Sequence, residues 1–204
     1  MCKEAADVHP RLRCAEDVHD CKGDSMPVYL LTVHAYRSWS EGHSRGYVQH
    51  NDGLQPASSE LACWREAQAN HPPARFDRDA QRALIEVTLA IVQEKQLRAH
   101  ASVATQTHVH VVVSFRSPNC TCGNPKNHCN RGCAARGFAE EVIVRMKRKM
   151  GQALAKMNGT SGRPYFSRGW DLTRVKDRQH FDFLIETYLP KHAEVENGVV
   201  EMYE

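Results

Sequence analysis

The sequence predicts an α+β protein with a ferredoxin-like split βαβ sheet, helices on one face of that sheet and a Cys-rich insertion. The order strand, helix, strand, strand, helix, strand, helix contains the strand–helix–strand unit twice, which is the arrangement of this fold. The 204 residues, of which 41% are hydrophobic, are enough for one core with additional segments. In this topology the first and third strands are neighbours at the centre of the sheet.

A long connecting segment, which we call the excursion, separates the first predicted strand from the first long helix. Residues 28–36 are rich in β-favouring side chains and predict the strand. Residues 38–76 hold Gly, Ser, Asn and two adjacent prolines and predict a long loop with a short helix around 59–68. Residues 77–96 then carry apolar side chains at helical spacing behind Asp77, which is a suitable N-cap.

Two strands and a second long helix follow. Residues 97–105 and 108–115 predict a pair of strands with a tight connection between them. Residues 137–158 predict a helix with one apolar stripe and a ridge of Lys and Arg around the rest of its surface. The segment 163–175 alternates aromatic and basic residues and predicts a bent strand or hairpin, a mixture that suits phosphate contacts with bases stacked on rings.

The last predicted element is a helix over residues 177–189, capped by Asp177. Pro190 is expected to stop it. The resulting domain organisation is a polar Cys- and His-containing extension, a main domain with two insertions, and an acidic C-terminal tail; the ranges are 1–25, 26–193 with 38–76 and 117–136 as insertions, and 194–204.

A histidine pair on the third strand is the first candidate site. His108 and His110 are two residues apart, so on a strand both imidazoles project from the same side. Two neutral imidazoles side by side supply half of a metal site. The alternative is a pair of solvated histidines on a polar face. His34 of the first strand is a candidate extra ligand or substrate contact, because a one-residue register shift decides which face it uses.

A cysteine cluster is the second candidate site. Four cysteines and a histidine fall within fourteen residues rich in Gly, Pro and Asn, which cannot pack a core of their own. In a reducing compartment thiolates of this kind bind a structural Zn²⁺. The alternatives are disulfides or a disordered loop. The residues concerned are Cys120, Cys122, Cys129, Cys133 and His128.

Charge is unevenly distributed although the net charge is only +3. Residues 131–180 hold twelve Lys and Arg against four acids, while residues 181–204 hold six acids against one lysine. Such asymmetry indicates a surface for a polyanion, with an ordinary solvated helix as the alternative. The candidate nucleic-acid contacts are Arg145, Lys147, Arg148, Lys149, Arg168 and Arg174. No apolar run has the length of a membrane span and no signal pattern is evident, so we expect a cytoplasmic protein without membrane contact.

Three short motifs carry a resemblance to a known family. "Thr107-His108-Val109-His110-Val-Val-Val" resembles the histidine–hydrophobic–histidine motif of HUH single-strand DNA nucleases. It is followed by a basic helix, by "Tyr-Phe-Ser-Arg-Gly-Trp" and by "Glu-Thr-Tyr188-Leu-Pro-Lys-His192". This order, over roughly residues 26–193, is similar to the single-tyrosine insertion-sequence transposases, and in particular to the repeat-associated tyrosine transposases, which hosts often keep as single copies.

The resemblance implies a chemistry and a set of roles. Tyr188 would be the nucleophile that becomes linked to a 5′ phosphate, and His192 would complete the metal site with His108 and His110. The implied cofactor is Mg²⁺ or Mn²⁺, although three histidines favour manganese or zinc. The implied partner is single-stranded or hairpin DNA, with association with the nucleoid and a homodimer as further expectations. Pro190 is a departure, since it perturbs the helix that would aim His192 at the metal.

Two other functions remain open from the sequence. One is a catalytically inactive nucleic-acid-binding regulator, a domesticated relative with a structural zinc site. Two features favour it: Pro190, and His192 at the position where the family has Gln or Asn as the third metal ligand. The retained His108, His110 and Tyr188 favour the enzyme. The other is a zinc-stabilised interaction protein whose functional face is the cysteine cluster.

Overall fold

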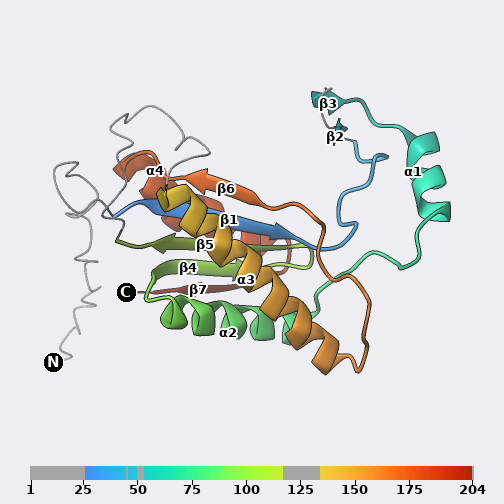
Figure 1. Ribbon diagram of the computed structural model, residues 1–204. Helices are drawn as coiled ribbons and strands as arrows, with labels where there is room; N and C mark the ends of the chain where they lie inside the picture. The colour runs from blue at the N-terminus through green and yellow to red at the C-terminus, as the bar shows by residue number, and fades with distance from the viewer. Residues whose placement is uncertain (1–25, 45, 50–52, 117–133, 204) are drawn as a thin grey trace, which may run out of the picture.

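The computed structural model describes residues 26–44, 46–49, 53–116 and 134–203. Its centre is a five-stranded antiparallel sheet with the strand order β6-β1-β5-β4-β7 (Figure 1). The strands are β1 (Val28–His34), β4 (Arg98–Ala104), β5 (His108–Ser114), β6 (Asp171–Arg174) and β7 (Val199–Met202). The α+β class is as predicted, and the first and third predicted strands, β1 and β5, are neighbours as expected.

Two long helices cover one face of the sheet. They are α2 (Arg78–Glu94) and α3 (Ala134–Met157); in Figure 1, α3 crosses in front of the strands and α2 runs below β7. The Asp77 carboxylate accepts a hydrogen bond of 2.8 Å from the Ala80 N–H and caps α2 as predicted. Alternate residues of β1 and β5, such as Leu31 and Val111, join the apolar stripes of both helices in the larger core.

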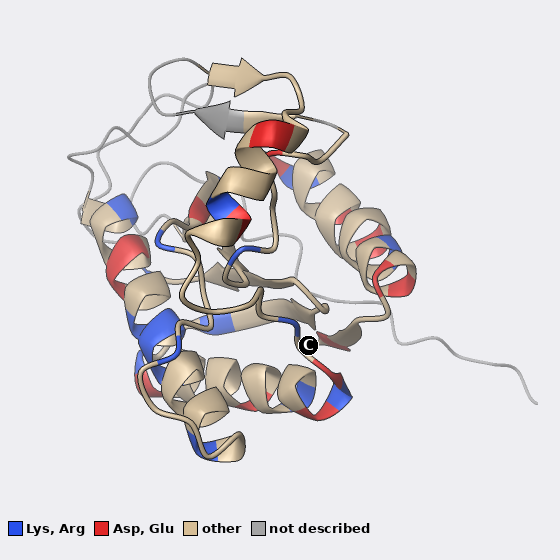
Figure 2. Cartoon of the chain, turned by 90° about the vertical axis from the view of Figure 1, so that its right-hand side faces the viewer, with Lys and Arg blue, Asp and Glu red and all other residues tan. Residues whose placement is uncertain are grey.

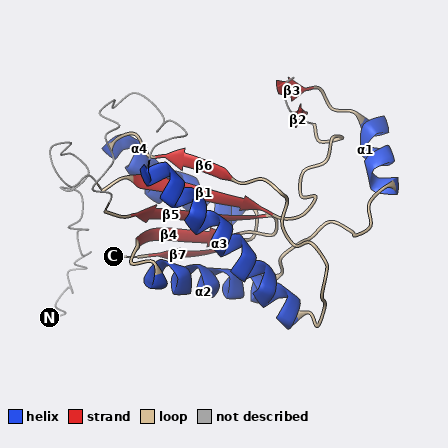
Figure 3. Ribbon diagram, in the orientation of Figure 1, coloured by secondary structure: helices blue, strands red, loops and turns tan. Residues whose placement is uncertain are grey.

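The opposite face carries the C-terminal helical segment, so the expectation of helices on one face holds only for α2 and α3. This segment consists of α4 (Arg178–Asp182), the π-helix η2 (Phe183–Tyr188) and α5 (Leu189–Val195). Figure 3 shows helices in front of and behind the strands. Leu184, Ile185 and Leu189 pack here against Leu30 and Val112, the residues of β1 and β5 that alternate with the first core.

Pro190 does not end the helical segment, which corrects the sequence prediction. The chain widens before it: the N–H of Leu189 donates to the carbonyl of Leu184, five residues back. Proline in an α-helix removes a hydrogen bond and clashes with the carbonyl four residues earlier. A π-turn relieves both constraints, so α5 continues to Val195 with Pro190 in its first turn.

The acidic segment 194–204, expected as a tail, includes the edge strand β7. This strand pairs antiparallel with β4, with Ala101 opposite Met202 and Ala104 opposite Val199. The short run "Val-Val-Glu-Met" carries too little pattern to be recognised as a strand in isolation. Pairing with β4 is what makes it one.

The excursion between β1 and α2 contains a two-stranded sheet and a helix. These are β2 (Tyr47–Gln49), β3 (Gly53–Gln55) and α1 (Ser59–Ala67), which project away from the main sheet in Figure 1. The helix around 59–68 is therefore confirmed. Among the described helices, none combines the length and the apolar character needed to cross a membrane.

Candidate active site

The two central strands present polar side chains to the face that the C-terminal segment covers. In the antiparallel register His34 lies opposite His108, and Thr32 lies opposite His110. The Thr32 hydroxyl is 2.9 Å from Nδ1 of His110. The rings of His108 and His110 stack with centres 5.7 Å apart, so both project from the same side of β5 as the sequence predicts.

Glu196, the C-cap residue of α5, joins the C-terminal segment to the turn between β4 and β5. Its carboxylate accepts hydrogen bonds from the hydroxyls of Thr105 and Thr107, each at 3.0 Å. The chain beyond it passes so close to β4 that a Cβ at Gly198 would stand 2.9 Å from the carbonyl oxygen of Ala104. Only glycine fits there without a shift of the backbone, and this close approach keeps Glu196 over the turn.

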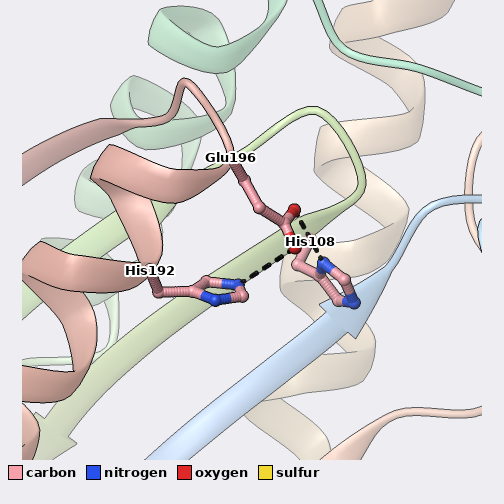
Figure 4. A group of neighbouring side chains, drawn as sticks. All are labelled: His108, His192 and Glu196. Atoms are coloured by element: carbon pink, nitrogen blue, oxygen red, sulfur yellow. Dashed lines mark ion pairs between the residues drawn. The ribbon is translucent and has the colours of Figure 1, made fainter. Parts of the chain in front are cut away.

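His108, His192 and Glu196 converge into one group (Figure 4). One ligand atom of each lies within 4.8 Å of the other two. The Glu196 carboxylate is 3.5 Å from Nδ1 of His108 and 4.0 Å from Nε2 of His192. His110, the remaining predicted ligand, stands outside this group, but its ring centre is 4.8 Å from that of His192.

The two histidines of β5 are neutral. Burial, together with the neighbouring His34, lowers the pKa of His108 to about 4, and burial lowers the pKa of His110 well below its usual value. Since the Thr107 hydroxyl donates to Glu196, its oxygen is left to accept from Nδ1–H of His108 at 2.7 Å. This tautomer leaves a lone pair on Nε2 of His108.

Two buried ring nitrogens in the cluster have no hydrogen-bond partner among the described residues. They are Nε2 of His110 and Nε2 of His192. Buried polar atoms are almost always paired, and an orphan of this kind commonly marks a missing ion or water. Neutral imidazoles with one carboxylate form the donor set that divalent transition metals prefer. The residues present therefore fit a divalent metal ion.

Burial by itself would raise the pKa of the Glu196 carboxyl group, but the hydrogen bonds from Thr107 and Thr105 act in the opposite direction. With the neighbouring imidazoles of His108 and His192 they bring the pKa of Glu196 below its usual value. The group is a carboxylate at neutral pH. A charged oxygen ligand that two hydroxyls orient is the arrangement typical of a metal site with outer hydrogen-bonding partners.

Tyr188 lies against the same cluster. Its ring stacks on His192 with centres 5.6 Å apart and planes 9° apart, and it meets the edge of His110 at 6.0 Å. Burial, together with the charge of Glu196, raises the pKa of Tyr188 above its usual value. The four-residue separation of Tyr188 and His192 thus brings the two rings into contact over the first turn of α5.

His34 and Asp171 flank the cluster on the side of the edge strand β6. Nε2 of His34 is 2.7 Å from the Asp171 carboxylate, and the His34 ring meets the His108 ring at 4.8 Å. The hydrogen bond from His34 lowers the pKa of Asp171. The register that the sequence left open therefore puts His34 on the same face as the histidine pair.

The predicted basic contacts lie mostly on the other face of the sheet. Four of them belong to α3, and Arg174 of β6 lies opposite Tyr29, whose side chain is part of the α2–α3 core. Arg145 pairs with Glu94 of α2. Figure 2 shows Lys and Arg interspersed with Asp and Glu over the helices. The basic candidates and the histidine cluster are thus separated by the sheet.

The predicted zinc ligands lie outside the described residues. This holds for all four cysteines of the cluster and its histidine, namely Cys120, Cys122, Cys129, Cys133 and His128. The N-terminal extension 1–25 is outside them as well. The zinc site remains a prediction.

Sequence reasoning missed Glu196, Asp171 and the two threonines of the turn. A signal for Glu196 was available: it follows His192 by four residues, so a helix that continues past Pro190 puts both on one face. Asp171 gave no local signal, because its role depends on β6 pairing with β1. The threonines could be recognised only from the contact between the β4–β5 turn and the C-terminal segment.

No family profile matches the chain, and no curated protein matches it. Two solved structures are similar in fold. A REP-associated tyrosine transposase bound to a REP hairpin is 7% identical, with a TM-score of 0.41 over 83% of this chain and 67% of that one. A protein from Deinococcus radiodurans R1, described as a transposase, is 12% identical, with a TM-score of 0.35 over 94% and 97%.

Both are described as transposases. At these identities and TM-scores the likeness is too weak to assign a function. The assignment has to come from the side chains of the site.

Proposed function

We propose that this protein is a metal-dependent single-strand DNA endonuclease and strand transferase of the transposase type, with Tyr188 as nucleophile. The observation that carries the proposal is the contact of one tyrosine with a cluster of buried and partly buried histidines, one of which faces a carboxylate. A phosphodiester is a poor electrophile because its charge repels nucleophiles, so a site that cleaves it needs a nucleophile next to concentrated positive charge.

His108, His192 and Glu196 would hold the divalent ion, with His110 completing the set. When bound, the ion supplies positive charge that polarises the scissile phosphate and favours ionisation of a neighbouring phenol. Thr107 and Thr105 keep the Glu196 carboxylate oriented, and Thr32 does the same for the His110 ring.

Tyr188 would attack the phosphorus atom through its phenolate oxygen. The new bond joins the tyrosine oxygen to the 5′ phosphate, the bond from phosphorus to the 3′ oxygen breaks, and a proton taken up by that oxygen yields a free 3′ hydroxyl. The covalent link conserves the energy of the broken bond, so attack by another 3′ hydroxyl reverses the step and joins strands. Stacking on His192 fixes the direction of the Tyr188 ring in this step.

The substrate of the proposal is single-stranded DNA, including a single strand that flanks a hairpin. This part rests on the resemblance of the sequence motifs. The competing function, an inactive regulator, drew support from Pro190 and from the histidine in place of the usual amide ligand. Because α5 continues through Pro190 and His192 reaches the cluster, the first of these reasons no longer favours the regulator.

The test is a nicking assay on labelled single-stranded oligonucleotides from the DNA that flanks the gene, with Mn²⁺ or Mg²⁺. We expect a covalent protein–DNA adduct with the wild-type protein and none with Tyr188→Phe. Tyr203→Phe is the matched control, because Tyr203 is a half-buried tyrosine outside the cluster whose hydroxyl bonds to Glu201.

Metal binding is measured separately by Mn²⁺ titration. Tyr188→Phe is expected to keep Mn²⁺ affinity, whereas Glu196→Gln is expected to lose both Mn²⁺ binding and adduct formation. If the protein binds DNA but forms no covalent adduct with any metal ion, the proposed endonuclease activity is contradicted and the inactive DNA-binding regulator becomes the favoured function.

A further inference from the structure

A pocket of about 510 Å³ lies between α3 and the segment that leads into β6, on the face of the sheet opposite the histidine cluster. Neither the proposed catalytic residues nor the metal ligands line it. The residues that define it are an aromatic ring, a glycine of the helix, three cations and a buried tyrosine, namely Trp170, Gly151, Lys147, Arg148, Arg163 and Tyr165.

Trp170 is held in a fixed position although 37% of it is exposed. The Lys147 ammonium lies 5.6 Å from the centre of the indole. It also donates hydrogen bonds to the carbonyls of Arg168 at 2.7 Å and Gly169 at 3.3 Å, the two residues before the tryptophan. An exposed indole on a segment that is tied down in this way is preorganised, so a stacking partner would lose little entropy to order it.

Gly151 leaves room on the helix side of the pocket. Glycine in a helix interior costs roughly 0.5–1 kcal/mol relative to alanine, so its presence in α3 calls for a reason. Apart from the backbone of α3 itself, no atom of the described residues lies within 4 Å of the position that a Cβ would take at Gly151. A side chain there would therefore not clash with the protein but would extend into the pocket.

The positive charge of the pocket indicates an anionic ligand. Lys147, Arg148 and Arg163 line it, and the lining residues include no Asp or Glu. The Arg163 guanidinium lies 5.7 Å from the ring centre of Tyr165, and its Nε is buried without a partner among the described residues. An aromatic platform flanked by cations is the arrangement that binds single-stranded nucleic acid, with a base on the ring and phosphates on the cations.

The pocket is also close to the candidate active site along the chain. Trp170 immediately precedes Asp171, the carboxylate that bonds to His34 beside the cluster. Asp171 lies on β6, which is an edge strand, and consecutive residues of a strand point to opposite faces. A single strand can therefore pass from the cluster around the edge of the sheet to Trp170 without crossing another strand.

We propose that an unpaired nucleotide of the DNA strand stacks its base on Trp170 in this pocket, with adjacent phosphates on Arg148 and Arg163. The inference deepens the proposed function, on which it rests, by giving the substrate a second contact around the β6 edge. It accounts for basic residues that lie across the sheet from the tyrosine.

The experiment measures the affinity of the full chain for a fluorescein-labelled thymidine oligonucleotide by anisotropy. Trp170→Ala is expected to weaken binding by about 5- to 100-fold, the range for loss of one base–aromatic stack, and Trp170→Phe is expected to restore most of it. Gly151→Leu is expected to weaken binding to a similar extent by filling the pocket.

Matched controls separate these effects from general damage. Gly137→Leu changes a glycine of the same helix that also has open space around it and lies outside the pocket. Trp64→Ala removes an exposed tryptophan of α1. Both are expected to leave the oligonucleotide affinity unchanged, and melting curves of every variant verify that it is folded.

The outcomes distinguish the pocket from the proposed function, because adduct formation is measured on the same samples. Wild-type affinity in Trp170→Ala with adduct still formed overturns the pocket and leaves the enzyme standing. Weakened binding in Trp170→Ala but not in Gly151→Leu puts the base outside the pocket and also overturns it. If binding depends on Trp170 but the wild-type protein forms no adduct, the result supports the nucleotide pocket and contradicts the proposed enzymatic activity. An absence of any wild-type binding overturns the pocket, with a protein partner as the next candidate.

Discussion

The carboxylate of Glu196 shows how the site depends on single side chains. It accepts from two hydroxyls of the β4–β5 turn and faces His108 and His192 from the end of α5. A carboxylate that has only solvent around it keeps many rotamers, whereas one with two hydroxyl donors is held in one orientation. The threonines therefore act on metal affinity without touching the metal themselves.

Substitution of Thr107 by valine tests this role. The hydroxyl is lost from both Glu196 and His108 while the β-branched shape remains. Loss of an outer hydrogen-bonding partner typically lowers metal affinity about 10- to 100-fold, and we expect that range for Mn²⁺ measured by calorimetry. Thr173→Val is the matched control, because Thr173 is an exposed threonine of β6. Equal Mn²⁺ affinity in Thr107→Val and the wild type would contradict a role of Thr107 in orienting the Glu196 carboxylate.

Buried histidines also make the stability of the metal-free protein depend on pH. Burial lowers the pKa of His100 to about 4, and Nε2 of this residue is 2.9 Å from the Ser114 hydroxyl. Histidine in an unfolded chain has a pKa of about 6.5, so between pH 6.5 and 4 the unfolded state binds more protons than the native state. Stability is therefore complete above this window and falls as pH is lowered through it.

We expect the melting temperature of chelator-treated protein to drop as pH falls from about 6.5 to about 4, with a smaller drop in His100→Gln. His108 and His110 contribute in the same direction, so the variant reduces the pH dependence without abolishing it. Ser114→Ala, which removes the hydrogen-bond partner but keeps the titrating ring, should retain a drop of wild-type size. Parallel pH curves for His100→Gln and the wild type would contradict the assignment.

At the scale of elements, the π-turn η2 sets the direction of Tyr188, His192 and Glu196 relative to the helical residues before it. It widens the chain between Phe183 and Tyr188, so the residues after it are rotated relative to a regular α-helix. Each residue of an α-helix turns by about 100°, which makes one residue of register enough to move His192 away from the cluster. Pro190 disfavours the regular register and is the local reason for the widening.

Pro190→Ala should therefore lower Mn²⁺ affinity while it keeps or raises the melting temperature. Alanine restores a backbone donor and allows α5 to start as a regular helix, in which His192 and Glu196 leave their present positions. Leu189→Ala is a contrasting variant, since it empties a fully buried position of the second core and should lower the melting temperature. Unchanged Mn²⁺ affinity in Pro190→Ala would mean that packing alone maintains the π-turn.

The elements that the sequence predicted are those with a strong local pattern. The strand pair around His108, the capped helix behind Asp77 and the long helix with its apolar stripe all have a period that a single sequence displays. The path of the chain through Pro190 and the strand β7 have no such pattern, because each depends on packing against the sheet. The candidate site follows the same division: the histidine pair came from alternation, whereas the spacing of His192 and Glu196 is informative only once the helix is known to continue past Pro190.

At the scale of the whole molecule, the sheet separates the histidine cluster from the basic residues of α3. A DNA strand cleaved on one face gains affinity from the other face only if it passes around an edge of the sheet, and β6 is the edge strand that Trp170 precedes. The six basic candidates are then not equivalent. Arg145 is committed to Glu94 and Lys147 to two backbone carbonyls, whereas Arg148 and Lys149 are exposed.

This difference predicts which cations release counterions when DNA binds. For single strands each phosphate contact contributes about 0.7 to the slope of log affinity against log salt concentration. We expect the double variant Arg148→Ala/Lys149→Ala to reduce that slope by about 1.4, for two lost contacts. Arg145→Ala is expected to leave the slope unchanged, because its charge is paired within the protein.

The measurement is oligonucleotide affinity by anisotropy over a series of salt concentrations, with the melting temperature as a check on the fold. An equal fall of the slope in Arg145→Ala would mean that Arg145 leaves Glu94 for a phosphate when DNA binds. An unchanged slope in the double variant would put the strand away from α3. The second result would confine the DNA to the histidine face, so the exposed cations of α3 would then be a solvated helix surface.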